Sequence, residues 1–349
     1  MARILYGVMG DARGHVNRGL TVAQEMPHHE YLFVGGGQVH DLEAHGYRVL
    51  DVPVPGTLYR NNRVDVPATV DNALRVFLGR QRIVHEITKI IDSYNPDLII
   101  SDYEFFTPLA AKQAGRACVS LDHQHVLTHC HCDSPPVQRV SRLMTNFSVR
   151  HLYSSASIFV VISFYRVPPK DPRTTSVLPP VIRPAAREYE PSAGEHVLVY
   201  QTSPTFHSLF PILEQMKGPF FIYGFGEKPA SKNLVFKAPS NHGFLEDLAS
   251  ARYVIVNGGH NVISEALYLG KPVLSFPIAN AYEQFLNAFY LGRLGYGDFS
   301  LQATPGREIF EAFENRLDFF RANIRLGKFF GNTELIDCLE SLIRRGVGC

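Results

Sequence analysis

Short apolar runs alternate with amphipathic stretches along the chain. In the first half, the apolar runs predict strands at residues 3–8, 31–34, 48–52, 97–101, 117–121 and 158–162. Apolar residues at helical spacing predict helices near residues 16–25, 39–45, 66–94, 108–114 and 137–153. Strands that alternate with helices in this way are typical of a parallel sheet with helices on both faces.

A second alternation follows an irregular stretch. Residues 168–191 are rich in proline and lack periodicity, which predicts a connection between two domains. The pattern restarts with strands at 196–201 and 220–223 and helices at 206–216 and 245–249. Thr304 and Pro305 predict the N-cap and first residue of a helix towards Ile324, and a last helix covers roughly residues 334–344. We therefore expect an α/β protein with two doubly wound domains, residues 1–182 and 183–349.

The most informative segment follows an apolar run at residues 253–256. The run ends in Asn257 and the pair Gly258-Gly259, and a helical pattern then covers residues 261–269. This is a βαβ unit with glycines at a helix N-terminus, where free amides and the helix dipole favour an anion. A phosphate can approach glycine backbone because no Cβ is in the way, although a glycine pair also serves a tight turn.

Two glutamates and a glutamine follow these glycines in the sequence. Apolar residues of the helix recur at helical spacing and leave Glu265 off the apolar face. A carboxylate one turn from a phosphate site can accept hydrogen bonds from ribose hydroxyls. Glu283 and Gln284 come just after the next strand, at the sheet edge where ligands of open α/β sheets bind. Together these positions predict a nucleotide-sugar pocket.

This segment resembles the donor-binding motif of GT-B glycosyltransferases, in particular the peptidoglycan N-acetylglucosaminyltransferase and the UDP-glycosyltransferases. His260 departs from the pattern, because it follows the glycines, whereas the plant and animal enzymes place a His before them. The resemblance implies two Rossmann-like doubly wound domains that face a cleft, with the acceptor-binding domain first and a terminal helix that packs back on it. The shared order is Gly258-Gly259, Ser264-Glu265, Gly270-Lys271-Pro272, Pro277, Glu283-Gln284 and Asn287-Ala288.

The resemblance also implies the residues of the donor site. Glu265 would hold the ribose, Glu283 and Gln284 the sugar hydroxyls, and the backbone near Phe244 the uracil edge. The polar residues that end at Ser203 would touch the donor phosphate. For Ser203, capping of a helix is an equal alternative. For Phe244, packing in the core is an equal alternative to contact with the uracil. The full donor-binding set is Gln201, Thr202, Ser203, Phe244, Gly258, Gly259, His260, Asn261, Ser264, Glu265, Glu283 and Gln284.

In the first domain, the glycine-rich turn after the first strand contains Gly14-His15, which matches the Gly-His of the family's first-domain loop. The resemblance implies that His15 is the general base for the acceptor hydroxyl, a role that suits a side chain titrating near neutral pH. Asp102 is the expected partner that orients the ring, with Glu104 as its rival. Ordinary polarity of helix starts and strand ends is the alternative. The acceptor-side set is Gly14, Asn17, Glu104, His123 and His125.

Histidine and cysteine are dense between His123 and Cys132. Zinc needs three or four ligands, and no second Cys/His pair stands at finger spacing, so we expect no metal here and favour acceptor recognition by His123 or His125. Arginines after residue 56 form either a solvated helix face or a contact to an anionic or lipid-linked acceptor. They are Arg60, Arg63, Arg75, Arg80 and Arg82.

Composition narrows the class of protein to which the chain can belong. The chain has 349 residues, 45% of them hydrophobic, which is enough for two domains with full cores. A net charge of +1 gives no electrostatic case for binding nucleic acid. The first residues lead straight into a strand rather than a secretory signal, and five cysteines suit a reducing compartment without disulfides. We expect a cytoplasmic protein, with peripheral contact to a membrane left open.

The resemblance to GT-B enzymes implies an inverting, metal-independent hexosyltransferase that needs no cofactor. It would move a sugar from a nucleotide-sugar, by preference a UDP-sugar, to an acceptor hydroxyl, while Gly258, Gly259 and the helix amides stabilise the departing diphosphate. The acceptor is a glycan, a lipid-linked molecule or a small molecule. Two alternatives stay open: a non-hydrolysing UDP-sugar 2-epimerase of the same fold, and a nucleotide-sugar-binding module without catalysis.

Overall fold

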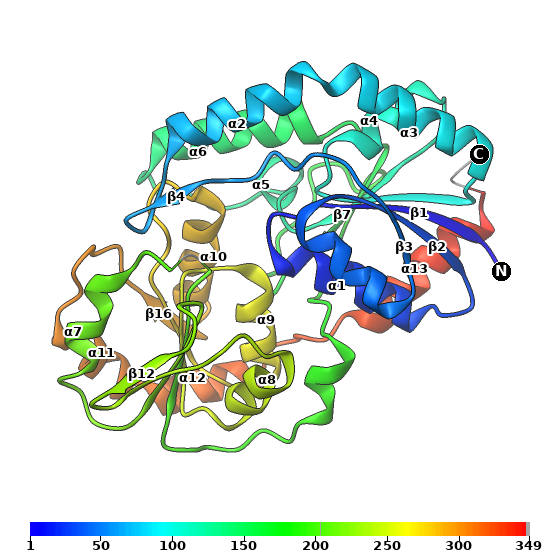
Figure 1. Ribbon diagram of the computed structural model, residues 1–349. Coiled ribbons are helices and arrows are strands. Elements are labelled where there is room, and N and C mark those ends of the chain that lie inside the picture. The colour runs from blue at the N-terminus through cyan, green and yellow to red at the C-terminus, as the bar shows by residue number, and fades with distance from the viewer. Residues whose placement is uncertain (203, 347–349) are drawn as a thin grey trace. The chain divides into compact units, whose positions relative to one another are not determined.

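The computed structural model describes residues 1–202 and 204–346 and divides them into two compact units (Figure 1). The first unit comprises Met1–Leu58, Asp65–Val181 and the described part of Phe330–Cys349. The second comprises Tyr59–Val64 and Ile182–Phe329. The chain therefore passes between the units more than once, and a six-residue hairpin from the first half of the sequence belongs to the second unit.

The first unit contains a seven-stranded parallel sheet in the order β3-β2-β1-β6-β7-β8-β9. Its strands are β1 (Arg3–Val8), β2 (Glu30–Val34), β3 (Arg48–Leu50), β6 (Leu98–Asp102), β7 (Val119–Asp122), β8 (Ile158–Ile162) and β9 (Thr175–Leu178). The helical segments are α1 (Arg13–Glu25), η1 (Gly37–His45), α2 (Val66–Leu78), α3 (Arg80–Tyr94), α4 (Phe106–Gln113), α5 (Val126–His129), α6 (Arg139–Ser148), η2 (Val149–Tyr153) and α13 (Asn332–Arg344).

Both faces of this sheet are buried, as the period of two along β1 requires. Ile4 and Tyr6 pack into the core on one face, whereas Leu5 packs into the core on the other. The C-terminal helix α13 joins the first of these cores through Leu335 and Leu339, which are both fully buried or nearly so. Each fully buried aliphatic side chain of this kind contributes about 1.5–3 kcal/mol, so α13 is an integral part of the first unit.

The second unit contains another seven-stranded sheet, in the order β12-β13-β11-β10-β14-β15-β16, in which only the pairing of β12 with β13 is antiparallel. Its strands are β10 (Val197–Tyr200), β11 (Phe220–Tyr223), β12 (Lys228–Ser231), β13 (Leu234–Phe236), β14 (Val254–Val256), β15 (Val273–Ser275) and β16 (Gly297–Phe299). The hairpin consists of β4 (Tyr59–Arg60) and β5 (Arg63–Val64).

Helices cover this second sheet, and α11 and α12 fill its core with aromatic rings such as Phe310, Phe313 and Phe320. The helical segments are η3 (Pro184–Glu188), η4 (His207–Leu209), α7 (Phe210–Leu213), α8 (Asn241–Ser250), α9 (His260–Tyr268), α10 (Tyr282–Arg293), α11 (Arg307–Glu314) and α12 (Leu317–Ile324). In the described part of the chain, no helix combines the length and apolar character needed to cross a membrane.

Several element boundaries differ from the sequence predictions. The predicted helix over 66–94 is two helices, because Gly79 ends α2 and precedes α3 and glycine is a poor helix former. Thr304 and Pro305 do not open a helix: Gly306 is the N-cap of α11. The predicted helix over 206–216 is reduced to η4 and the four-residue α7. The proline-rich stretch 168–191 contains β9, so it is more than a connection.

Candidate functional site

The first group of predicted residues meets at the carboxyl ends of β1 and β6. These strands are parallel neighbours, and their register places Val8 opposite Asp102. The glycine-rich turn after β1 leads into α1 at Arg13, so His15 lies in the first turn of that helix. Asp102, the last residue of β6, is fully buried at the same edge. The topology therefore brings together two residues that are 87 positions apart.

The His15 ring contacts the Asp102 carboxylate directly. Its Nδ1 lies 2.5 Å from Asp102 Oδ1. A third residue, Arg18, binds both oxygens: Nη2 donates to Oδ1 at 2.5 Å and Nε donates to Oδ2 at 2.6 Å. Arg18 and Asp102 are both buried, whereas the His15 side chain is 12% exposed. The carboxylate is thus held on its inner side by the guanidinium, and the ring remains reachable.

This arrangement favours one tautomer of the neutral His15 ring. A carboxylate accepts hydrogen bonds, so the neutral ring donates from Nδ1 towards Asp102 and has its lone pair on Nε2. Nε2 faces the side-chain nitrogen of Gln124 at 3.5 Å. Burial alone lowers the pKa of the Arg18 guanidinium, but the adjacent Asp102 charge outweighs burial and raises that pKa above its ordinary value. The guanidinium therefore stays charged beside Asp102.

Sequence reasoning missed Arg18 and Gln124. Arg18 is three residues after His15, on the same side of α1, and it is a buried arginine beside the apolar Val16, Gly19 and Val22. A cation at an otherwise apolar helix position was the available signal, because buried arginine is rare unless it is paired. Gln124 carried no comparable signal.

Glu104 is not the partner of His15. Its carboxylate accepts hydrogen bonds from the backbone N–H groups of Phe106 at 2.9 Å and Thr107 at 2.6 Å. It therefore satisfies free amides at the start of α4, which is the capping role left open as the alternative. Burial raises the pKa of the Glu104 carboxyl, while these hydrogen bonds oppose that rise. Among the other acceptor-side residues, Gly14 and Asn17 lie on α1 and are half-buried.

The structure does not support acceptor recognition by His123 or His125. Each is 1% exposed, and both ring nitrogens of each have partners inside the first unit. His123 contacts the Ile162 carbonyl at 2.7 Å and the Tyr165 hydroxyl at 3.4 Å. His125 contacts Asp122 Oδ2 at 2.7 Å through Nδ1, and its Nε2 contacts a serine hydroxyl. Both histidines are satisfied core residues.

A different group of ligand atoms converges in the first unit. Among the described residues, His28, His29 and Glu340 place one ligand atom each within 4.8 Å of the others. The Ala2 backbone N–H donates to His29 Nδ1 at 3.0 Å, so His29 Nε2 carries the hydrogen and donates to Glu340 at 3.1 Å. A nitrogen that already carries hydrogen is not a metal ligand, and this group is better described as a hydrogen-bonded cluster that ties α13 to the turn before β2.

The second group of predicted residues lies at the carboxyl ends of β10, β14 and β15. Gly258 follows β14 with a φ of 128°, a region that favours glycine, and a Cβ there would lie 2.8 Å from the backbone oxygen of Gln284. Gly259 is the N-cap of α9, and a Cβ there would meet no atom closer than 3.9 Å. Gly258 therefore permits close packing within the protein, whereas the surroundings of Gly259 are open to a ligand.

Asn257 joins the glycine turn to the loop after β10. Its side-chain oxygen accepts from the Thr202 N–H at 2.9 Å, and its side-chain nitrogen donates to Gln201 Oε1 at 2.6 Å. Gln201 is fully buried, and its Nε2 has no hydrogen-bond partner among the residues that the structure describes. Ser203, predicted with these residues, lies outside the described residues. Asn257 itself was not singled out from the sequence, although it opens the glycine turn.

Glu265 is on α9 as predicted, but it is buried rather than open. Arg183 binds it through two hydrogen bonds, from Nε to Oε1 at 2.6 Å and from Nη2 to Oε2 at 2.8 Å. Burial alone lowers the pKa of Arg183, and the Glu265 charge outweighs it and raises that pKa. The Glu265 side chain is 8% exposed, so its oxygens keep little accessible surface. Arg183 lies in the proline-rich stretch, where no periodic pattern could connect it with Glu265.

Other residues of the motif differ in how many of their polar groups are available to a ligand. The Ser264 hydroxyl donates to the His260 carbonyl one turn earlier at 2.8 Å and is 1% exposed, so it stabilises α9 rather than pointing outward. The His260 ring contacts Asn261 Oδ1 at 3.2 Å. These contacts leave the backbone of the first helical turn as the part of this segment best suited to a ligand.

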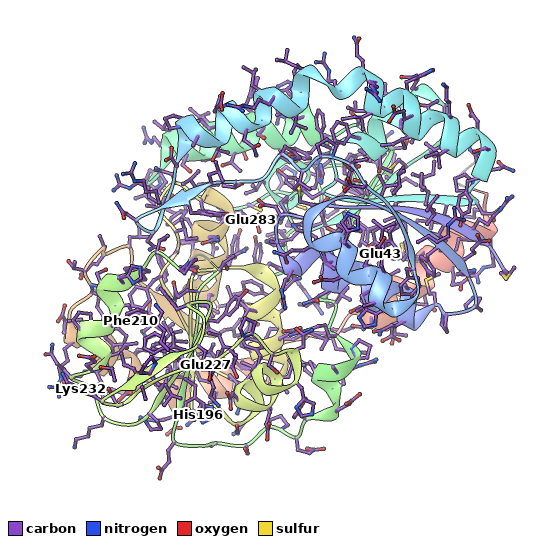
Figure 2. The ribbon with its side chains drawn as sticks, in the orientation of Figure 1. Glu43, His196, Phe210, Glu227, Lys232 and Glu283 are labelled. Atoms are coloured by element: carbon purple, nitrogen blue, oxygen red, sulfur yellow. The ribbon has the colours of Figure 1, made fainter. Side chains whose placement is uncertain are left out.

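Glu283 lies in the first turn of α10 and is half-buried (Figure 2). Among the described contacts it has neither a hydrogen bond nor an ion pair. The neighbouring Gln284 is more constrained, because its Oε1 accepts from the Ile278 N–H at 3.0 Å. Phe244 is half-buried on α8, edge-on to Tyr200 and Tyr223 at ring distances of 5.4 and 5.2 Å. A half-buried aromatic ring is suited to contact a nucleobase.

Comparisons with known proteins agree with this architecture. A family model described as "Glycosyl transferase family 1" matches residues 2–317. An uncharacterized glycosyltransferase of Methanosarcina acetivorans is 26% identical over 325 residues, which cover 84% of this chain and 82% of that protein. The glycosyltransferase SnogD from Streptomyces nogalater has a TM-score of 0.62 at 18% identity, covering 98% of this chain and 99% of that chain. MurG from Acinetobacter baumannii has a TM-score of 0.64 at 16% identity, covering 98% and 100%. The predicted GT-B fold class is confirmed.

Proposed function

Because the chain belongs to glycosyl transferase family 1, we propose that it transfers a hexosyl group from a UDP-sugar to an acceptor hydroxyl, with inversion at the sugar carbon and without a metal. The observation that carries this proposal is the group formed by His15, Asp102 and Arg18. It presents the outer nitrogen of a ring, backed by a buried carboxylate, at the sheet edge where a substrate of an α/β domain binds.

His15 supplies the base in this proposal. Its Nε2 takes the proton of the acceptor hydroxyl while the hydroxyl oxygen forms a bond to the anomeric carbon of the sugar. The bond from that carbon to the diphosphate oxygen breaks, and its electron pair leaves with the diphosphate. The ring becomes an imidazolium next to Asp102, whose negative charge stabilises it. A positioned base of this kind contributes typically about 10²–10⁴ in rate.

The second unit holds the donor in this proposal. The first turn of α9 offers backbone N–H groups beside Gly259, where no Cβ blocks a phosphate. The free carboxylate of Glu283 accepts hydrogen bonds from sugar hydroxyls, and Phe244 lies against the base. Glu265 accepts hydrogen bonds from the ribose. Because Arg183 already occupies both of its oxygens, ribose binding uses their remaining lone pairs.

The acceptor in this proposal is lipid-linked or is used at a membrane surface. Helix α6 supports this, because its large apolar side chains point to solvent while its buried residue is Ser141. Val140, Leu143 and Phe147 are 71%, 69% and 65% exposed, at a spacing that forms one stripe. Residues 137–151 contain no Asp or Glu, and they include Arg139, Arg142 and Arg150. An apolar stripe with flanking arginines is typical of a helix that lies in an anionic membrane interface.

Calorimetric titration with UDP, GDP, dTDP and CMP, with and without EDTA, tests the donor assignment. We expect micromolar binding of UDP that does not change with EDTA. Binding of a different nucleotide would correct the donor, and EDTA-sensitive binding would refute metal independence. Failure of all four nucleotides to bind would refute the proposed function.

A turnover assay separates transfer from the alternatives. A radiolabelled UDP-sugar is incubated with the protein, with and without an extract of membrane lipids. Release of UDP that depends on the extract, with label recovered in the lipid, is expected. Interconversion of the UDP-sugar without any acceptor would indicate the epimerase instead, and binding without turnover would favour the non-catalytic module.

A further inference from the structure

The hairpin formed by β4 and β5 is an unusual part of the second unit. It turns through Asn61 and Asn62, whose φ angles of 50° and 52° are both positive, as a two-residue type I′ turn requires. Asparagine tolerates this conformation better than most residues. The turn places Arg60 and Arg63 directly opposite each other on the two strands. The hairpin belongs to the first half of the sequence, yet it is built into the second unit (Figure 1).

Asn62 connects this turn to the three loops that carry the proposed donor residues. Its N–H donates to Thr205 Oγ1 at 2.8 Å, in the loop after β10. Its side-chain oxygen lies 3.4 Å from Asn257 Nδ2, in the glycine turn after β14. Its carbonyl accepts from the Ala279 N–H at 3.0 Å, in the loop between β15 and α10. Thr202, Gly258 and Glu283 lie in or just after these loops, so the hairpin tip lies at the same end of the sheet.

The two arginines of the hairpin lack the partners that would explain them. Both are exposed, and the described residues give neither one an ion pair or a side-chain hydrogen bond. Like charges directly opposite each other on paired strands are destabilising. Two unpaired cations at adjacent positions therefore point to an anionic ligand rather than to a structural role.

The proposed donor site needs such cations. It contains the carboxylates of Glu265 and Glu283, and the guanidinium of Arg183 is already bound to Glu265. A nucleoside diphosphate brings further negative charge, which increases on the leaving group during transfer. Backbone amides of α9 supply only partial charge, equivalent to about half a unit at a helix N-terminus. Gln201 is one hydrogen bond away from Asn257, and its buried Nε2 is a donor to which the described part of the chain offers no acceptor.

We propose that Arg60 and Arg63 bind the diphosphate of the nucleotide-sugar and take the place of a metal ion in stabilising the leaving group. This inference rests on the proposed function, because it assigns a role to residues beside the donor site. The arginine forks match phosphate oxygens in geometry as well as in charge. The hairpin thereby makes a segment of the first half of the sequence part of the donor site.

The test compares UDP, uridine and inorganic pyrophosphate as ligands of wild-type protein and of the double variant Arg60→Gln/Arg63→Gln. We expect the variant to bind UDP at least about tenfold more weakly and to lose pyrophosphate binding, while its affinity for uridine stays within twofold. Because both side chains are exposed and two like charges that face each other are removed, the variant should unfold at or slightly above the wild-type temperature. Restoring the charge with Arg60→Lys/Arg63→Lys should recover part of the UDP affinity.

The matched control is Arg75→Gln/Arg82→Gln, which removes the same charge from exposed helical positions of the first unit. The control should bind UDP as the wild type does. An unchanged UDP affinity in the hairpin variant would overturn the inference and leave the proposed function standing. A parallel loss of uridine and UDP affinity would also overturn it, because the hairpin would then only shape the loops. Absence of any UDP or pyrophosphate binding by the wild type would refute both.

Discussion

Replacing Asp102 by asparagine tests whether the first site is a catalytic group or only a structural one. The carboxylate receives three hydrogen bonds, one from His15 and two from Arg18. Asparagine keeps one oxygen but turns the other position into an amide that donates. That amide faces either an Arg18 N–H, which it repels, or His15 Nδ1, to whose lone pair it donates a hydrogen bond. In the second case Nε2 carries the ring hydrogen and is no longer a base.

The structure separates the cost to stability from the cost to activity. Removing the charge of one partner from a buried ion pair costs about 3–5 kcal/mol, because the other partner is left unpaired. In Asp102→Asn, Arg18 is the partner that is left unpaired. His15→Ala leaves the bond between Arg18 and Asp102 in place and removes one hydrogen bond, which costs about 0.5–1.5 kcal/mol. Both variants should lose at least about a hundredfold in kcat, whereas only Asp102→Asn should lose much stability.

The chain contains no tryptophan whose fluorescence could report unfolding. Stability is therefore measured by hydrogen exchange of the β1 and β6 amides. The turnover assay is run well below the unfolding temperature, and UDP affinity is measured in parallel. The double variant Arg18→Met/Asp102→Leu is the control, since it removes the buried charges together: it should recover stability but not activity. If His15→Ala retained near wild-type turnover, or if it lost UDP affinity and turnover equally, the assignment of His15 as the base would be wrong.

Further predictions concern the second unit, metal dependence and α6. Gly258→Ala should destabilise the protein by about 1–3 kcal/mol in thermal unfolding because of its positive φ; Gly259→Ala should leave stability unchanged but weaken UDP binding about tenfold in calorimetry, since its Cβ would occupy only ligand space. Glu265→Ala should weaken UDP binding before it affects turnover at saturation, and unchanged affinity would contradict ribose binding. Turnover after EDTA treatment and desalting should equal that of untreated protein; recovery only on adding a divalent cation would contradict this. Leu143→Ser/Phe147→Ser should abolish flotation with anionic vesicles without changing the unfolding temperature, and equal flotation with neutral vesicles would contradict the role of the arginines.

The sequence predicted the secondary structure best where the apolar periodicity is strong and local. The strand at residues 3–8 and the strand at 220–223 match β1 and β11 to the residue. The pair of His15 and Asp102 was also predicted, because strand ends of a parallel sheet lie at one edge and both residues matched a family pattern. Boundaries failed where glycine or proline competed with an apolar pattern, as at Gly79 and Thr304.

The contacts of the predicted residues could not be predicted in the same way. Glu104 and His125 have residue types that suit catalysis, and burial with local partners is what assigns them to capping and core roles. Burial depends on packing between elements that are distant in sequence. The same holds for Arg183, which lies 82 residues before Glu265. A pattern of apolar spacing contains no information about such a pair.

The two sites share a physical design that the family motifs do not describe. In each unit, a carboxylate assigned to the chemistry is bound at both oxygens by an arginine outside the motif: the buried Arg18 binds Asp102, and the half-buried Arg183 binds Glu265. A bidentate guanidinium fixes the plane of the carboxylate, so the site is oriented before the substrate arrives. Removing either partner of such a pair lowers the stability of the protein, since it leaves a buried charge without its counter-ion. The arginines of the hairpin are the opposite case, exposed and unpaired, and that contrast is why we assign them to the substrate rather than to the fold.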